Sequence, residues 1–376
     1  MRIAKTFLLA AFVVALAFAI GPRHTDAAQP AKLTVAGLGN EANEYVSVRD
    51  RVYLPLKQTA QALAYRTIWD ARTRSITLQG IDKKITLTKR ALSGADFYSK
   101  NGRTYASLAF YSKNLGLTYN TYDAAKLIKL SSPYYYKSEG DHSIWVDKKT
   151  TMLYYAKGTR QPLPINKTNL TFLEQATFAD ATVKELSQGV VYMRVTENYG
   201  EPSLNFDTYQ ALIKNGKVVK QQNKSFHGWR DHEDVEFVDQ GVLFNDGDTA
   251  TIYGKDGSAA LVADLTESLG FEGPFVVEAV QDRFWFVREY RSSKLSLLDI
   301  RSGKSILLYK QLLNPDEIAI LDEQKSPAIG ENVEFNTFGD HLTFKKIDMA
   351  KKLVYFDHLN WLKSEKSTLV FDLSKM

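Results

Sequence analysis

The 376-residue chain contains no cysteine. This absence excludes a disulfide framework, a thiol nucleophile, an iron–sulfur site and a Cys-ligated zinc site. The sequence also lacks a Gly-x-Ser-x-Gly elbow, a phosphate-binding loop and a dinucleotide fingerprint, which mark three common enzyme classes. Charge of one sign is not in large excess, because 48 Lys and Arg are interspersed with 43 Asp and Glu. A nucleic-acid partner is therefore not expected, since it would require a concentrated basic face.

What the chain does contain is an ordinary globular composition, with 44% hydrophobic and 24% charged residues. A chain of this length exceeds the size at which a single core stops growing, about 250–300 residues, and so suggests two or three domains.

The N-terminus has the pattern of a secretory signal peptide. Arg2 and Lys5 precede an apolar run over residues 7–20, and small residues follow up to Ala28. The run is shorter than the ~20 residues that a membrane-spanning helix needs. We therefore expect residues 1–28 to be removed, leaving a secreted or cell-envelope-associated protein with no stable membrane span.

The region after the signal peptide contains an internal repeat at an offset of 52 residues. Residues 51–63 align with residues 103–115, and residues 76–78 align with residues 128–130. Each unit predicts a short strand, a helix and a hairpin. Because neither unit could bury its apolar face alone, we expect residues 33–131 to form one α+β module of two repeated strand-helix-hairpin units.

Specific residues within the first unit define its expected elements. Leu56, Ala60 and Leu63 recur at helical spacing, which places them on one buried helix face. The hairpin is expected to pair residues 65–69 with residues 75–78 around a charged turn.

The same residues carry a resemblance to a known family. The run 52–57, followed by Ala60 and residues 68–70, resembles the copper amine oxidase N-terminal-like domain of secreted proteins from spore-forming bacteria. Residues 101–105 are similar to the second copy of that domain, although residues 106–109 have lost its Pro and Arg. The resemblance implies an extracellular module attached to varied proteins, and it implies no oxidase chemistry.

Residues 132–376 are expected to form a mainly β domain built from repeats. Short β-branched and aromatic runs alternate with polar turns, and turn centres fall near residues 216, 257, 303 and 350. Because a four-stranded blade takes ~40–50 residues, this spacing predicts a β-propeller-like domain, with a large sandwich as the alternative. Residues 145–150 are expected to begin an earlier unit, and helices are expected near residues 263–269 and 315–323.

Four sequence features have the residue types of a functional site. Residues 196–201 approach the quinone-forming motif of amine oxidases, but Gly200 replaces the required acid and the chain has no His-x-His pair. His227 and His232 lie five apart around a glycine, which fits no recurring metal spacing. Residues 246–248 favour a hairpin turn over a calcium loop, and the aromatic run 134–136 favours packing over sugar stacking.

The sequence therefore predicts no catalytic, cofactor-binding or metal-ligating residue and no cofactor. The expected function is non-enzymatic binding or structure, with a cell-wall polymer or another extracellular protein as partner. The alternative is an extracellular polysaccharide hydrolase whose paired carboxylates lie in the β domain, because such a pair is recognised only by its separation in space.

Overall fold

The computed structural model describes residues 34–36, 45–49, 51–117, 127–170, 178–187, 189–200, 205–227, 232–323 and 339–376. The expected signal peptide, residues 1–28, lies outside this part of the chain. Residue contacts divide the protein into two compact units. The first consists of the residues up to Leu63 together with Leu87–Ser131, and the second of Ala64–Thr86 together with Ser132–Met376.

The first unit is organised around the pairing of two repeat-related strands. Strand β3 (Arg51–Pro55) pairs antiparallel with β8 (Arg103–Ser107), and Leu54 lies opposite Ala106, its own counterpart 52 positions later. The sheet order β2-β3-β8-β7 is therefore symmetric about this pair. The remaining elements are β1 (Thr34–Ala36), β2 (Val46–Val48), α2 (Leu56–Ala62), α3 (Lys89–Leu92), β7 (Phe97–Lys100), α4 (Leu108–Leu115) and β9 (Leu127–Lys129).

The helices α2 and α4 follow β3 and β8 directly and supply the core of this unit. Leu56, Ala60 and Leu63 are buried in the first copy, and Leu115 is buried at the end of α4. Ser107 caps helix α4, because its side chain accepts a hydrogen bond from the Phe110 N–H at 3.1 Å. This cap satisfies a backbone donor at the helix start.

The second unit consists of six antiparallel sheets whose strands follow one another in chain order. The first sheet contains β4 (Arg66–Asp70), β5 (Ser75–Gln79) and β6 (Lys84–Leu87). Four four-stranded sheets follow. The first two contain β10 (Tyr134–Glu139), β11 (His142–Asp147), β12 (Met152–Lys157) and β13 (Leu163–Lys167), and then β14 (Phe178–Ser187), β15 (Val190–Tyr199), β16 (Asn205–Lys214) and β17 (Lys217–His227). The next two contain β18 (Phe237–Val238), β19 (Gly241–Asn245), β20 (Thr249–Gly254) and β21 (Ala259–Asp264), and then β22 (Phe275–Gln281), β23 (Phe284–Glu289), β24 (Lys294–Asp299) and β25 (Lys304–Leu307). The last sheet contains β26 (Leu342–Asp348), β27 (Leu353–Asn360) and β28 (Glu365–Asp372), with η2 (Leu373–Lys375) after it.

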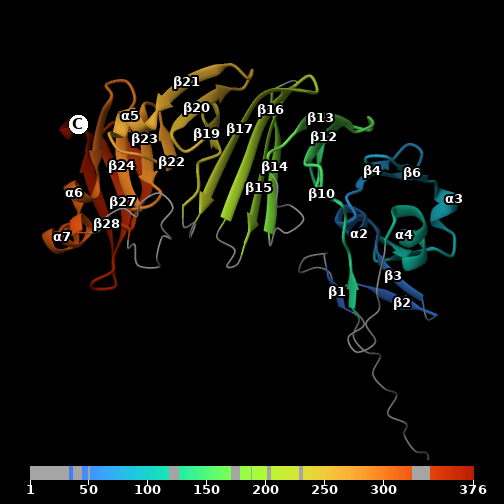
Figure 1. The fold of residues 1–376 in the computed structure, drawn as a ribbon. Helices are drawn as coiled ribbons and strands as arrows, with labels where there is room; N and C mark the ends of the chain where they lie inside the picture. Colours follow the sequence, from blue (N-terminus) through green and yellow to red (C-terminus); the bar gives the residue numbers. More distant parts are fainter. Residues whose placement is uncertain are drawn as a thin grey trace, which may run out of the picture. The chain divides into compact units, whose positions relative to one another are not determined.

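Each sheet of the second unit packs against the next, as the row of sheets from β10 to β28 shows in Figure 1. Val146 and Val195 share one core between the sheets β10–β13 and β14–β17, and Tyr192 and Phe244 share the next. Two further clusters continue the series as far as β26–β28. Among the described residues no core cluster joins the last sheet to the first. The prediction of a mainly β repeat domain is confirmed, and its sheets form a stacked series.

The predicted turns fall at two kinds of position. The turns near residues 216, 257 and 303 join the third and fourth strands of their sheets, as a regular repeat requires. The turn near residue 350 joins β26 and β27, which are the first two strands described in the last sheet. The assumption that this turn continues the same series was therefore wrong, because hairpins with similar polar turns occur at several places in such a sheet.

Within residues 132–376, two predicted helices are confirmed and the short helix α6 (Tyr309–Leu312) was missed. Helices α5 (Leu265–Leu269) and α7 (Pro315–Glu323) occupy the expected regions. Helix α6 (Tyr309–Leu312) was not predicted, because its four residues are too few to show a helical period. The segment 145–150 lies within a four-stranded sheet, but Trp145 belongs to its second strand and does not begin the unit.

Arg66 connects the sheet β4–β6 to the sheet β10–β13. Its guanidinium donates hydrogen bonds to the backbone oxygens of Asp141 at 2.9 Å and Gly158 at 2.5 Å. Gln79 adds a third link by donating from Nε2 to the Arg160 oxygen at 2.7 Å. The first hairpin of the repeat is therefore part of the second unit, together with the β domain.

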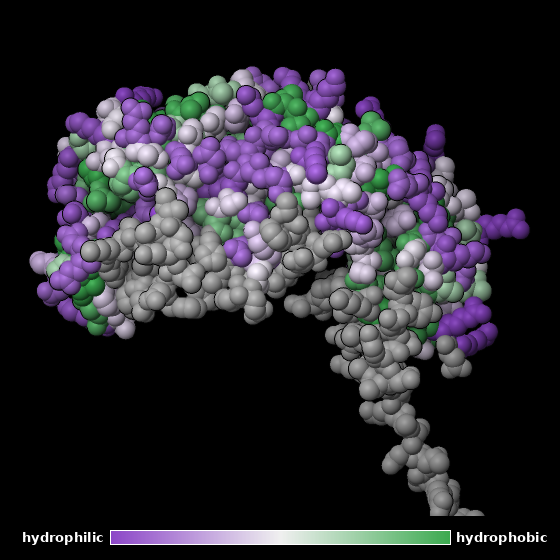
Figure 2. Space-filling view, viewed as in Figure 1, coloured by the Kyte–Doolittle hydropathy of each residue, from purple (hydrophilic) through white to green (hydrophobic). Residues whose placement is uncertain are grey.

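On the face drawn in Figure 2, apolar side chains do not gather into one large patch. Hydrophilic residues dominate the face drawn in Figure 2, and apolar residues are scattered among them. The large exposed apolar side chains come from separate elements: Trp69, Leu163, Val219, Val262, Met349, Leu359, Leu362 and Val370. In the part of the chain that the structure describes, no helix is both long and apolar enough to cross a membrane.

Candidate functional site

The strongest candidate site is a cavity of about 440 Å³ at the edge of the sheets β10–β13 and β14–β17, which we call the inter-sheet pocket. Its lining comes from four separate segments: β12 with its following turn, β13, the β14–β15 turn and the β16–β17 turn. The lining residues are Tyr155, Ala156, Lys157, Arg160, Gln161, Leu163, Ile165, Gly189, Asn215, Gly216 and Lys217.

Backbone geometry at two turns shapes this pocket. Asn215 and Gly216 both adopt the left-handed conformation, with φ of 52° and 78°, as a two-residue hairpin turn between β16 and β17 requires. Asn215 donates its N–H to the Gly189 oxygen at 3.0 Å. Gly189 has a φ of 80°, and an added Cβ would lie 2.9 Å from the Asn215 Oδ1. The Asn-Gly pair and Gly189 therefore bring the two turns together.

The charge of the inter-sheet pocket is of one sign. Lys157, Arg160 and Lys217 contribute three cations, and among the described lining residues there is no carboxylate. Lys157 forms an ion pair of 3.1 Å with Glu185, which lies outside the lining. Hydrogen bonds from Lys157, His142 and the Gly189 N–H lower the pKa of Glu185 to about 2, so this carboxylate is ionised. The pocket suits an anionic ligand.

The inter-sheet pocket also offers apolar and amide contacts. Leu163 is 63% exposed and forms part of the pocket lining together with Ile165 and the ring of Tyr155. Gln161 and Asn215 supply side-chain amides that can donate and accept hydrogen bonds. Cations, amides and an apolar wall together can contact a ligand that carries both negative charge and apolar surface.

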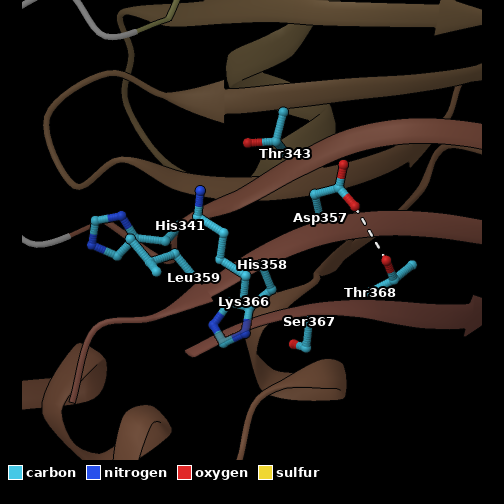
Figure 3. Close-up of a pocket in the computed structure, with 8 residues that line it drawn as sticks. All are labelled: His341, Thr343, Asp357, His358, Leu359, Lys366, Ser367 and Thr368. Carbon is cyan, nitrogen blue, oxygen red and sulfur yellow. Dashed lines mark hydrogen bonds between the residues drawn. The ribbon is translucent and has the colours of Figure 1, made fainter. Parts of the chain in front are cut away.

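A second cavity, of about 540 Å³, lies on the last sheet (Figure 3). His341, Asp357, His358 and Lys366 contribute its charged and titratable groups. Figure 3 shows Asp357 directed toward Thr368, whose hydroxyl donates to the Asp357 carboxylate at 3.2 Å. The Lys345 ammonium is 2.9 Å from the same carboxylate. Asp357 is thus the single carboxylate among the described lining residues, and it is already paired.

A third cavity, of about 430 Å³, contains two carboxylates, Glu317 and Glu365. Glu317 is 2% exposed and its Oε1 lies 3.2 Å from the His358 Nε2. Its Oε2 accepts a hydrogen bond from Asn314 at 2.6 Å, and its N–H is accepted by the Asn314 side chain at 3.1 Å. These contacts hold the Glu317 side chain at the start of helix α7.

The structure places the oxidase-like segment at the end of an interior strand, β15, which lies between β14 and β16. Residues 196–199 end strand β15, and Gly200 follows with a φ of 98°. The Tyr199 hydroxyl donates to Asp207 at 3.1 Å, and burial, together with Asp207, raises the pKa of Tyr199 to about 12. Residue 201, which ends the motif, lies outside the described residues.

The other sequence-selected residues are not brought together. His227 ends strand β17, and the description does not extend to its side chain. The His232 Nδ1 lies 2.8 Å from the Glu278 Oε1, beside the buried Arg288. In the segment 246–248, the Asp246 carboxylate accepts the N–H groups of Asp248 and Thr249 at 3.0 and 2.7 Å, which makes it part of a hairpin turn.

The aromatic run packs on both sides of strand β10. Tyr136 contacts Trp145, with ring centroids 5.1 Å apart, and Tyr134 contacts Tyr154 at 6.5 Å. Tyr135 contacts the core on the opposite face, between the sheets β10–β13 and β14–β17. This run therefore fills two sheet interfaces.

Sequence reasoning did not identify the inter-sheet pocket. Its three cations come from β12, the turn after it and β17, and each is an ordinary surface residue in its local context. The one local signal was the Asn-Gly turn at residues 215–216, which marks a hairpin but not a pocket.

Comparison with known families supports the N-terminal resemblance. Residues 40–130 match the copper amine oxidase N-terminal domain. The predicted resemblance is thereby confirmed for this part of the chain, close to the expected range of 33–131. No curated protein sequence matches the chain.

Solved structures give distant likenesses. A chain of the nidogen/laminin complex is 13% identical, with 65% of this chain and 79% of that chain covered and a TM-score of 0.23. Apo AztD from Citrobacter koseri is 9% identical, with 83% of each chain covered and a TM-score of 0.22. A second structure of Citrobacter koseri AztD is 10% identical, with 82% and 83% covered and a TM-score of 0.21. At these scores the alignments do not define a shared fold.

Proposed function

We propose that this protein is a secreted or cell-envelope-associated, non-enzymatic binding protein that holds a segment of an anionic cell-wall polymer in its inter-sheet pocket. The observation that carries the proposal is the lining of this pocket, in which Lys157, Arg160 and Lys217 occur without a carboxylate. A negatively charged polymer gains charge-assisted hydrogen bonds from such a set of donors.

Three further features support binding over turnover. The residues that line the pocket lie at strand ends and turns of the stacked sheets, where binding residues are commonly found. The match to the copper amine oxidase N-terminal domain over residues 40–130 is compatible with an extracellular protein assembled from binding parts. The expected signal peptide would deliver this protein to the wall.

The alternative function is hydrolysis of an extracellular polysaccharide. The third cavity is the observation that favours hydrolysis, because Glu317 and Glu365 both line this cavity. However, Glu317 is held by Asn314 and faces His358, so it is placed as a structural carboxylate. A glycosidase would need both carboxylates directed at one bond.

The test is binding of the purified chain, without the signal peptide, to a purified anionic wall polysaccharide and to a neutral polysaccharide. We expect binding to the anionic polymer alone, and weaker binding as NaCl rises, because exposed charges are screened. The double variant Arg160→Ala/Lys217→Ala should lose about tenfold in affinity, since two exposed charge contacts contribute about 1 kcal/mol or less each.

The control double variant, Arg301→Ala/Lys375→Ala, removes one Arg and one Lys from exposed positions elsewhere in the second unit. It should bind as the unmodified protein does. Equal binding of the neutral polymer, or an unchanged affinity in Arg160→Ala/Lys217→Ala, would remove the pocket from the proposal. Release of soluble sugar on incubation would favour the hydrolase instead.

A further inference from the structure

Three potential metal ligands converge beside the first two large sheets of the second unit. Asp141 lies in the β10–β11 turn, His142 begins β11, and Glu185 lies on β14 of the next sheet. The His142 Nε2 is 3.1 Å from the Asp141 Oδ1 and 3.2 Å from the Glu185 Oε2. One ligand atom from each residue lies within 4.8 Å of the other two.

The imidazole is held in a fixed orientation. The His142 side chain is 4% exposed, and its Nδ1 lies 2.7 Å from the Tyr155 hydroxyl. The two rings are stacked, with an interplanar angle of 22°. The Tyr155 hydroxyl can accept a proton from Nδ1, which leaves Nε2 free to bind a metal. A hydrogen bond of this kind to the second ring nitrogen is usual for a metal-ligating histidine.

Two carboxylates face the same ring nitrogen, the His142 Nε2. An imidazole nitrogen with a lone pair would repel both carboxylate oxygens, and a single N–H proton can point at only one of them. The space between Nε2 and the two carboxylate oxygens is therefore filled either by the Nε2 proton, which points to one oxygen more than to the other, or by a metal ion. The N···O distances of 3.1 and 3.2 Å suit either, but only a metal ion would contact all three ligands at once.

The distances fit a small divalent cation. In a tetrahedral zinc site with bonds of about 2.0–2.1 Å, neighbouring ligand atoms lie about 3.3–3.4 Å apart. Both measured N···O separations are within about 0.3 Å of that edge. Asp141 and Glu185 are 50% and 35% exposed, so their side chains can adjust the remaining O···O distance.

The positive charge of Lys157 disfavours a metal ion at this position, but the Lys157 ammonium does not contact the Glu185 oxygen that would bind the metal. Its ammonium is 3.1 Å from the Glu185 Oε1, whereas the oxygen that faces His142 is Oε2. One imidazole nitrogen and two carboxylate oxygens form a donor set suited to zinc, with a fourth position left for water. We propose that Asp141, His142 and Glu185 form a Zn²⁺ site that links the sheets β10–β13 and β14–β17.

The proposed metal ligands lie outside the lining of the inter-sheet pocket, although Tyr155 and Lys157 belong to that lining and contact them, and the proposal revises the expectation of no metal site. The sequence could not show it, because Glu185 is 43 positions from His142 and belongs to another sheet. The sequence drew attention instead to His227 and His232, which provide a matched control.

The experiment is isothermal titration of ZnCl₂ into the metal-stripped chain, with any purification tag removed and no polymer present. We expect one saturable equivalent. Asp141→Asn and Glu185→Gln should each weaken binding at least tenfold, and the double variant should abolish it. Both residues are partly exposed, so folding should be retained, as circular dichroism can verify.

The control variant His227→Ala/His232→Ala should keep the full equivalent of zinc. The proposal is overturned if the unmodified protein binds no stoichiometric zinc, or if binding survives in Asp141→Asn/Glu185→Gln. Loss of zinc in the His227→Ala/His232→Ala variant alone would also overturn it, by placing the metal at the other histidine pair.

Discussion

Trp145 donates a hydrogen bond from its indole Nε1 to the backbone oxygen of Ala64, 81 positions earlier, at 2.7 Å. Trp145 is fully buried, and Ala64, with a φ of 62°, lies two residues before strand β4. Together with Ile81 and Ala156, the two residues form the cluster that joins the sheet β4–β6 to the sheet β10–β13. A hairpin from the N-terminal repeat is thereby built into the β domain.

Trp145→Phe should lower the free energy of unfolding by about 1–3 kcal/mol, because it leaves the Ala64 oxygen buried without its donor. Urea denaturation followed by circular dichroism measures this change. Trp69 is 58% exposed, so Trp69→Phe serves as the control and should change stability by less than about 0.5 kcal/mol. Equal, small effects in both variants would show that the indole contact does not hold the two sheets together.

The sequence repeat located the elements that pair with each other, but it did not show which unit each element joins. Residues 51–63 and 103–115 show the same local pattern, and the structure pairs Leu54 with Ala106 across the centre of one sheet. The contact between Trp145 and Ala64 has no local signature, since a tryptophan in a strand can face any neighbour. Pattern reveals which face of an element is apolar, whereas the partner of that face depends on the tertiary structure.

The candidate sites were beyond sequence reasoning for a similar reason. Lys157, Arg160 and Lys217 become a cationic lining because three hairpin ends meet at one edge. Asp141 and His142 are neighbours in the sequence, but their significance depends on Glu185 from the next sheet. The helices α5 and α7 were predictable because their signals are local.

The pocket on the last sheet should make stability sensitive to acid. Burial, followed by the nearby charges of His358, Arg288 and His232, lowers the pKa of His341 below its ordinary value of 6.5, although Asp340 opposes this. The unfolded chain therefore binds the His341 proton more readily, so this contribution to stability is present above about pH 6.5 and declines as the pH falls below it.

His341→Asn should reduce the loss of stability between pH 7 and pH 5, which thermal unfolding across this range measures. Asparagine suits the position, because the backbone at residue 341 has a φ of 49° and asparagine tolerates the left-handed region better than most residues. Thr343→Asn alters the same pocket without a titratable group and should keep the original pH dependence. An identical acid response in the unmodified protein and His341→Asn would rule out this histidine as its source.

The stacked arrangement of sheets predicts that the outer face of β28 tolerates polar substitutions. Leu369 packs toward the core shared with the preceding sheet, whereas the adjacent Val370 is 46% exposed on the opposite face. The same outer face holds the Lys345–Asp357 ion pair, with both side chains about half exposed. A polar outer face is what a terminal repeat needs when no further sheet covers it.

Val370→Lys should therefore change the free energy of unfolding by less than about 0.5 kcal/mol, whereas Leu369→Lys should cost about 2 kcal/mol or more. Denaturant unfolding compares the two variants, which introduce the same charge one residue apart. If the sheets instead closed into a ring, a neighbouring sheet would cover Val370, and the added ammonium would be buried there. Comparable destabilisation by both substitutions would thus refute the open series and support a closed one.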